Sequence, residues 1–167
     1  FTSQDGLAWV MRAGSNTASL NGIAYGKGMF VAVGYDGIIL TSPDGVQWTP
    51  RASGAEEGLF GITSGNGIFV AAGYDGIILT SLDGSTWTKR NSQSKALLRS
   101  VVYGNGIFVA VGSGGTLLTS PDGNTWTKRT SGTLEELRGA AYGRNIFVAV
   151  GYDGTVLTSP DGVRWTA

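Results

Sequence analysis

The chain has 167 residues, and its 12 basic and 12 acidic side chains give a formal net charge of zero. This balance argues against nucleic acid as a partner, because nucleic-acid binding favours an excess of basic residues. Histidine and cysteine are both absent, which excludes disulfides and removes the commonest zinc ligands and the commonest general base. No apolar run is long enough to span a membrane as a helix.

A unit of 39 residues repeats along the chain without insertion or deletion. Residues 35–42 are identical in sequence to residues 74–81, which favours recent duplication or an engineered origin. Tandem four-stranded units of about 40 residues are the pattern of β-propellers. The tryptophans that mark the repeat are Trp9, Trp48, Trp87, Trp126 and Trp165.

The chain begins and ends inside a repeat. Residues 1–19 correspond to the outer two strands of a unit, so we expect a partial blade there. We expect complete blades at residues 20–58, 59–97 and 98–136, and a blade with a truncated last strand at 137–167, all in one propeller domain. A fragment of a longer or engineered propeller is one interpretation of this arrangement.

The second unit illustrates the four strands expected in each copy. A first strand near residues 59–64 ends at Gly65-Asn66-Gly67, which supplies the positive φ angles of a tight hairpin. The second strand, residues 68–72, is apolar at every position, as expected for a strand covered on both faces. The third strand is expected at residues 77–80 and an outer strand around residues 87–90, where apolar and polar residues alternate.

These patterns predict an all-β protein, a β-propeller of four-stranded 39-residue blades with four complete blades and a partial one. A sandwich rarely repeats so regularly, and solenoid coils are usually shorter, so both alternatives are less favoured.

Each turn before the outer strand reads Ser-x-Asp-Gly-x-x-Trp. This motif resembles the Asp-box turn of sialidase-type propellers, shortened by one residue between Asp and Gly. The wider unit is similar to bacterial repeat propellers and to the photosystem II assembly-factor propellers. The resemblance implies a propeller fold and favours an extracytoplasmic location, with which the lack of cysteine is compatible.

The resemblance also implies that the turn aspartates accept backbone N–H groups and that the tryptophans pack between neighbouring sheets. We therefore expect both sets to be structural, and we expect no metal, because one aspartate per turn supplies too few oxygens for calcium. The aspartates are Asp5, Asp44, Asp83, Asp122 and Asp161.

No catalytic constellation is evident. The arginines Arg12, Arg51, Arg90 and Arg129 share one repeat position and are expected around the rim as solvated charges of outer strands. The pairs Glu56-Glu57 and Glu135-Glu136 have no nucleophile or base beside them in the sequence. We expect neither enzyme activity nor a cofactor.

The most promising surface lies at one end of the blades. In an up-and-down blade, the connection between units and the turn between the second and third strands share one end. That turn carries Tyr35-Asp36, Tyr74-Asp75 and Tyr152-Asp153, but Ser113-Gly114 in the third unit. These tyrosines and aspartates are candidate ligand-binding residues. The alternative is that tyrosine covers the blade end and aspartate shapes the turn.

The sequence thus favours a non-catalytic scaffold or binding module. A repeat lectin with one sugar site per blade and an assembly factor with one non-repeated protein-binding patch are the alternatives. Unsatisfied sheet edges at both ends also favour a homodimer or other homo-oligomer in which blades of different chains close a ring.

Overall fold

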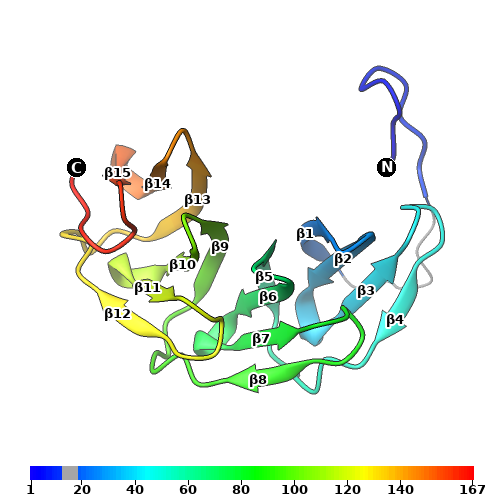
Figure 1. Cartoon of the computed structure of the whole chain (residues 1–167), viewed down its shortest axis with the longest axis horizontal. Helices are drawn as coiled ribbons and strands as arrows, with labels where there is room; N and C mark the ends of the chain where they lie inside the picture. The colour runs from blue at the N-terminus through cyan, green and yellow to red at the C-terminus, as the bar shows by residue number, and fades with distance from the viewer. Residues whose placement is uncertain (13–18) are drawn as a thin grey trace.

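The computed structural model describes residues 1–12 and 19–167. Four antiparallel sheets stand side by side in an open arc, with the amino-terminal hairpin at one end and the last sheet at the other (Figure 1). The repeat places a connection between units at residues 15–19, and of these only Ser19 lies within the described residues. No helix in the described part of the chain is long and apolar enough to cross a membrane.

Each sheet is one blade, and its strands are ordered as in the chain. The blades are β1 (Leu20–Gly26), β2 (Met29–Gly34), β3 (Ile39–Ser42) and β4 (Thr49–Arg51); β5 (Leu59–Gly65), β6 (Ile68–Gly73), β7 (Ile78–Ser81) and β8 (Thr88–Arg90); β9 (Leu98–Gly104), β10 (Ile107–Gly112), β11 (Leu117–Ser120) and β12 (Thr127–Arg129); and β13 (Leu137–Gly143), β14 (Ile146–Gly151) and β15 (Val156–Ser159). In the last blade, Thr166 adds only an isolated bridge to Thr158. The structure is therefore the all-β propeller architecture that the repeat predicts.

The third strand of each blade begins one residue later than the sequence suggests. The predicted strand at residues 77–80 is observed at Ile78–Ser81. The cause is a short 3₁₀ turn, Tyr74–Gly76, which is closed by a 2.9 Å hydrogen bond from the Ile77 N–H to the Tyr74 carbonyl. Because the Ile77 N–H closes this turn, only its carbonyl bonds to the second strand, where it accepts the Gly73 N–H at 3.1 Å.

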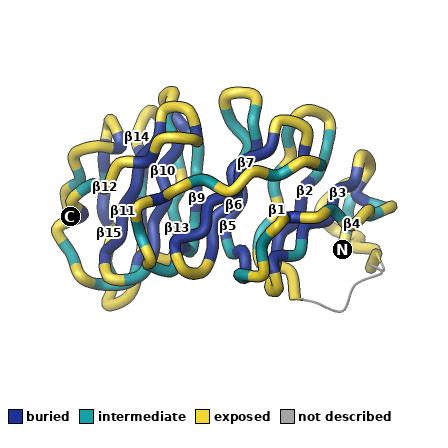
Figure 2. The backbone as a smooth tube through the Cα atoms, turned by 90° about the horizontal axis from the view of Figure 1, so that it is seen from below, coloured by how far each residue is buried: buried dark blue, intermediate teal, exposed yellow. Residues whose placement is uncertain are grey.

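The apolar second strands are covered on both faces, as predicted. In β6, Phe69 and Ala71 pack with the first blade, while Val70 and Ala72 pack with the third. Figure 2 shows the same layering, with buried residues in the middle of the strands and exposed residues in the loops at both ends. Stacking between blades therefore supplies the hydrophobic core, and no blade forms a core alone.

The strands β1, β5, β9 and β13 line the concave side of the arc and pack against one another in sequence (Figure 1). The short strands β4, β8 and β12 lie on the convex side. The residues of the first strands are thus the ones that face the centre of the incomplete ring.

The amino-terminal residues form a small hairpin beyond the first blade (Figure 1). Thr2 and Val10 exchange two backbone hydrogen bonds, and the Arg12 Nε donates to the Thr2 Oγ1 at 3.0 Å. The equivalent bond in the first blade, from the Arg51 Nε to the Thr41 Oγ1, measures 2.9 Å. Residues 1–12 therefore fold as the outer half of a blade.

Candidate binding surface

The turn before each outer strand is held by one serine and one aspartate. In the first blade, the Asp44 Oδ1 accepts the N–H groups of Val46 at 2.8 Å and Gln47 at 3.0 Å. The Ser42 Oγ accepts the Gly45 N–H at 2.8 Å and donates to Asp44 at 3.0 Å. The same aspartate bonds recur in the other turns at Asp5, Asp83, Asp122 and Asp161.

These bonds favour the ionised carboxylate and lower its pKa. At Asp83 the pKa falls from 3.8 to about 2, chiefly because the backbone N–H groups of Thr86 and Ser85 donate to it. The backbone bonds lower the pKa of the other four turn aspartates too. Within the described residues there is no group of three or more acidic side chains placed to hold a metal ion. The hydrogen bonds of these aspartates thus give them a structural role in the turn.

The tryptophans close the same turns. The Trp126 Nε1 donates to the Gly123 carbonyl at 2.9 Å, and its ring is buried between the second and third blades. Trp87 and Trp165 also pack into interfaces between blades. Trp9, on the amino-terminal hairpin, makes the bond to the Gly6 carbonyl but remains 60% exposed.

The arginines expected as solvated outer charges have a structural role instead. Arg51, Arg90 and Arg129 are only partly exposed. Each Nε donates to a threonine Oγ1 of the neighbouring third strand, at distances of 2.8 to 2.9 Å. This bond fixes the short outer strand to the blade, so the role of these arginine side chains is to stabilise the blade.

The 3₁₀ turns and the connections between blades meet at one end of the arc, which we call the loop end. The Tyr74 N–H donates to the Gly58 carbonyl of the preceding connection at 2.9 Å. Gly76 lies against Ser94 of the following connection, so closely that a Cβ at Gly76 would overlap its carbonyl. The predicted meeting of turn and connection at one end is therefore observed.

The aspartates of these turns shape the backbone. Asp36, Asp75 and Asp153 have φ values of 56°, 52° and 51°, in the left-handed region that aspartate tolerates better than most residues. Gly114 takes the same place in the third blade with φ 60°, which explains the departure from the repeat there. These residues thus have the left-handed backbone conformation that the turn requires.

The tyrosines, by contrast, join a larger surface. The Phe60 ring lies edge-on to Tyr35, with centroids 5.5 Å apart, and to Tyr74, with centroids 4.9 Å apart. Gly58 lies beneath both tyrosines, where a Cβ would come 3.2 Å from Tyr74. Edge-to-face packing of this kind holds the three rings in fixed orientations.

Arginines continue this surface toward the last blade. The Arg99 guanidinium lies 5.1 Å from the Phe60 ring centroid, and its Nε donates to the Glu136 Oε1 at 3.0 Å. Arg138 approaches the same oxygen at 3.5 Å and lies 4.9 Å from the centroid of Tyr152. We call this set the aromatic–arginine rim: Tyr35, Phe60, Tyr74, Arg99, Glu136, Arg138 and Tyr152.

The rim crosses all four blades and combines the repeated loop-end tyrosines with one position that varies between blades. One repeat position, on the first strand of each blade, supplies Asn21, Phe60, Arg99 and Arg138. Sequence reasoning identified the tyrosines but missed this position. The sequence does indicate this position, because its residue type varies between blades while most of the repeat is nearly identical. It also lies on the strand that faces the centre of the arc.

A family model for the DUF6242 beta propeller domain matches residues 68–167. The chain belongs to this family. No curated protein matches its sequence. Among solved structures, the chain is similar to "YCF48 bound to D1 peptide", with 20% identity and a TM-score of 0.70, covering 90% of this chain and 53% of that one. It is also similar to YCF48 from Cyanidioschyzon merolae, with 19% identity and a TM-score of 0.70, covering 92% of this chain and 57% of that one.

The computationally designed Ika4 protein is similar over more of its own length. The identity is 18% and the TM-score 0.69, and the match covers 87% of this chain and 92% of Ika4. At these identities the likenesses establish the fold alone. The DUF6242 chain spans little more than half the length of the YCF48 structures.

Proposed function

We propose that this DUF6242 propeller is a non-catalytic binding module, and that its aromatic–arginine rim binds an extended segment of another protein. The observation that carries the proposal is the continuity of the rim from the first blade to the last. The packed rings of Tyr35, Phe60 and Tyr74 lead to Arg99 and Arg138, and these lead to the ring of Tyr152. Tyrosine and arginine, with tryptophan, are the residues enriched where protein interfaces gain their binding energy.

The rim matches a protein ligand better than a sugar bound once per blade. A repeat lectin needs equivalent sites, yet the variable repeat position carries four side chains of three types, Asn21, Phe60, Arg99 and Arg138. A long ligand can use such differences. Its apolar side chains would lie on the half-exposed tyrosines, and its carboxylate or carbonyl oxygens would accept from the arginines.

The chemistry of the rim supports a binding role over catalysis. Its one carboxylate, Glu136, is held by both Arg99 and Arg138. The rim has no second carboxylate with which Glu136 could form an acid–base pair. The YCF48 structure with a bound D1 peptide supports a protein segment as the ligand class for a propeller of this shape.

Selection from a random peptide library tests the proposal. Peptides selected on the wild-type chain should lose at least about tenfold in affinity when Tyr74→Ala and Arg99→Ala are combined, which corresponds to about 1.4 kcal/mol. Arg164→Ala is the matched control, because Arg164 is exposed and lies in a Ser-x-Asp-Gly turn, outside the rim. Equal binding by wild type and the double variant, or no selected peptide at all, contradicts the proposal. A glycan bound in place of peptides would favour the lectin alternative.

A further inference from the structure

The two ends of the arc expose apolar sheet faces that are buried at every internal position. On the last blade, Ile146, Val150 and Val156 are 37%, 44% and 52% exposed. Their counterparts in the third blade, which face the fourth, are Ile107, Val111 and Leu117, and the last two are completely buried. The outer face of the last blade therefore keeps the side chains of a blade interface.

The first blade presents the opposite face. Ile23 is 61% exposed, whereas its equivalent in the second blade, Ile62, is 8% exposed because the first blade covers it. Leu20 is likewise exposed and its equivalent Leu59 is buried. At each internal interface, a face like that of the last blade packs on a face like that of the first. The two open faces are therefore complementary, because each internal interface of the chain joins one face of each kind.

One glycine position shows this complementarity in detail. A Cβ at Gly65 would overlap the ring of Tyr103 in the next blade, and a Cβ at Gly104 would overlap the ring of Tyr142. The corresponding Gly143 in the last blade has no atom within 4 Å of where its Cβ would be. Tyr25, the counterpart of those tyrosines in the first blade, is 59% exposed. A glycine without its tyrosine and a tyrosine without its glycine thus lie at opposite ends of the arc.

A second glycine position shows the same complementarity, here with the glycine on the first blade and its missing neighbours on the last blade. A Cβ at Gly123 in the third blade would lie 2.7 Å from Ile68 and 3.3 Å from Val70, both from the second blade. A Cβ at Gly45, the equivalent position in the first blade, would have no isoleucine or valine side chain nearby. Its nearest neighbour from outside the blade would be Thr2 of the hairpin. The counterparts of Ile68 and Val70 in the last blade are Ile146 and Val148.

We propose that the last blade of one chain stacks on the first blade of a second copy of this chain, and that two such junctions close the two arcs into one ring. Each junction would repeat an interface that the chain already forms internally, with Tyr25 of one copy against Gly143 of the other. The faces are apolar, so the hydrophobic effect drives the association. Two head-to-tail contacts close because the ends of each arc face the same opening (Figure 1).

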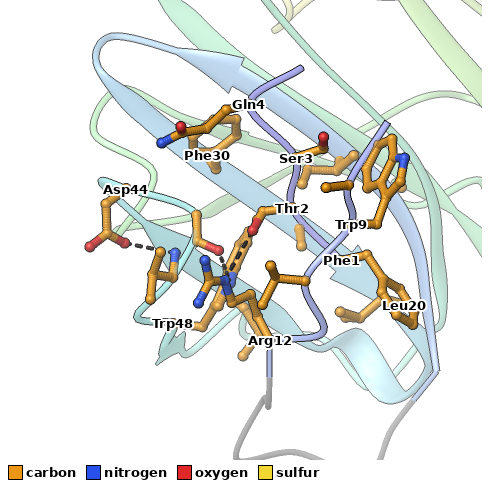
Figure 3. Close-up of a pocket in the computed structure, with 18 of the residues that line it drawn as sticks. Phe1, Thr2, Ser3, Gln4, Trp9, Arg12, Leu20, Phe30, Asp44 and Trp48 are labelled. Carbon is orange, nitrogen blue, oxygen red and sulfur yellow. Dashed lines mark hydrogen bonds between the residues drawn. The ribbon is translucent and has the colours of Figure 1, made fainter. Parts of the chain in front are cut away.

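The amino-terminal hairpin occupies part of the junction in the single chain. The Thr2 methyl group lies 3.6 Å from a Cβ at Gly45, nearly the same as the 3.5 Å between Thr80 and a Cβ at Gly123. The hairpin thus stands where the outer strands of a preceding blade would stand. Behind it is a cavity of about 1030 Å³, lined by Phe1, Leu20, Ile23 and Phe30 among others (Figure 3).

This cavity is the space that the inner strands of an incoming blade would fill. The incoming last blade carries its own copy of the outer segment, residues 159–165, with the same Ser-x-Asp-Gly-x-x-Trp motif as residues 3–9. The two segments cannot share one position. Docking of the second copy therefore displaces the hairpin, which acts as a weak competitor for the junction.

Solution mass against protein concentration tests the inference, which does not depend on ligand binding at the rim. Light scattering should show a mass that rises from 17.3 kDa to twice that value and stops there. Deleting residues 1–12 should shift this transition to lower concentration, since the competitor is gone. A chain that stays monomeric at all concentrations, with and without the hairpin, overturns the proposal, as does growth into open filaments.

Two substitutions locate the contact without disturbing the single chain. Gly143→Leu adds a side chain where the structure has open space and where φ is not in the left-handed region, and Ile23→Asp places a charge on an exposed position. Each should abolish the dimer and leave a folded monomer by circular dichroism. Leu134→Asp is the control, because Leu134 is 86% exposed in a connection and away from both faces. A dimer that survives both face substitutions, or is lost equally in the control, contradicts this interface.

Discussion

At the scale of single residues, the five tryptophans share one bond but differ in burial. Trp126 is 1% exposed and Trp9 is 60% exposed, although both donate to the glycine carbonyl of their own turn. Trp126→Ala leaves a cavity between two blades and should lower the free energy of unfolding by about 3–5 kcal/mol. Trp9→Ala should lower it by no more than about 1 kcal/mol. Urea unfolding of the two variants measures the contrast, and similar losses would show that the bond and not the burial stabilises the blade.

The turn aspartates make the fold sensitive to acid. The pKa of Asp83 is about 2 in the folded chain and its ordinary value is 3.8. As the pH falls, the carboxylate is therefore protonated at a lower pH in the folded state than in the unfolded state. The contribution is complete above pH 3.8 and is lost as the pH falls through about 2. The other four shift in the same direction and add to the effect.

Unfolding midpoints in urea should therefore fall between pH 4 and pH 2, a window taken from the two pKa values of Asp83. Asp83→Asn cannot ionise, so it should be less stable than wild type at neutral pH and lose less stability on acidification. An unchanged acid slope in the variant would mean that other groups cause the loss.

At the scale of elements, glycine sets how closely neighbouring blades approach. A Cβ at Gly104 would overlap the Tyr142 ring of the next blade, so Gly104→Ala should destabilise the chain by about 1–3 kcal/mol through overpacking. Gly139→Ala is the matched control, since its Cβ would meet only Val150 at an ordinary 3.4 Å and serine already stands at the equivalent position 100. Thermal unfolding of dilute samples separates the two, and equal stability would argue against tight stacking as the reason for the glycine.

The strands and the turns were predictable because their causes are local. Asn66-Gly67 has the two positive φ angles that its sequence predicts, 48° and 75°, and the apolar run at β6 is covered on both faces. The rim was only half predictable. The positions of Tyr35 and Tyr74 follow from the repeat, but their contact with Phe60 brings together residues of two blades, and the repeat alone does not give the orientation of a first-strand side chain.

At the scale of the whole molecule, the repeat predicts blades but not how far they curve. Curvature arises from the small rotation between neighbouring units, which depends on the volumes of side chains packed at each junction and not on the period. The 39-residue period does not determine the number of blades in a closed ring. The structure instead has four sheets in an arc whose first and last blades flank an opening (Figure 1).

The open arc predicts unequal protection along the chain. The second and third blades, β5–β8 and β9–β12, are stacked on both sides, whereas β1–β4 and β13–β15 each have one complete neighbouring blade. Because a stacked array is stabilised by nearest-neighbour interfaces, amide hydrogen exchange in dilute solution should be slowest in the two central blades. Raising the concentration should slow exchange at β1 and β14 toward the central values, since a second copy would cover those faces. Uniform protection at every concentration would mean that the outer blades need no partner, and faster exchange at the centre would contradict the stacking argument itself.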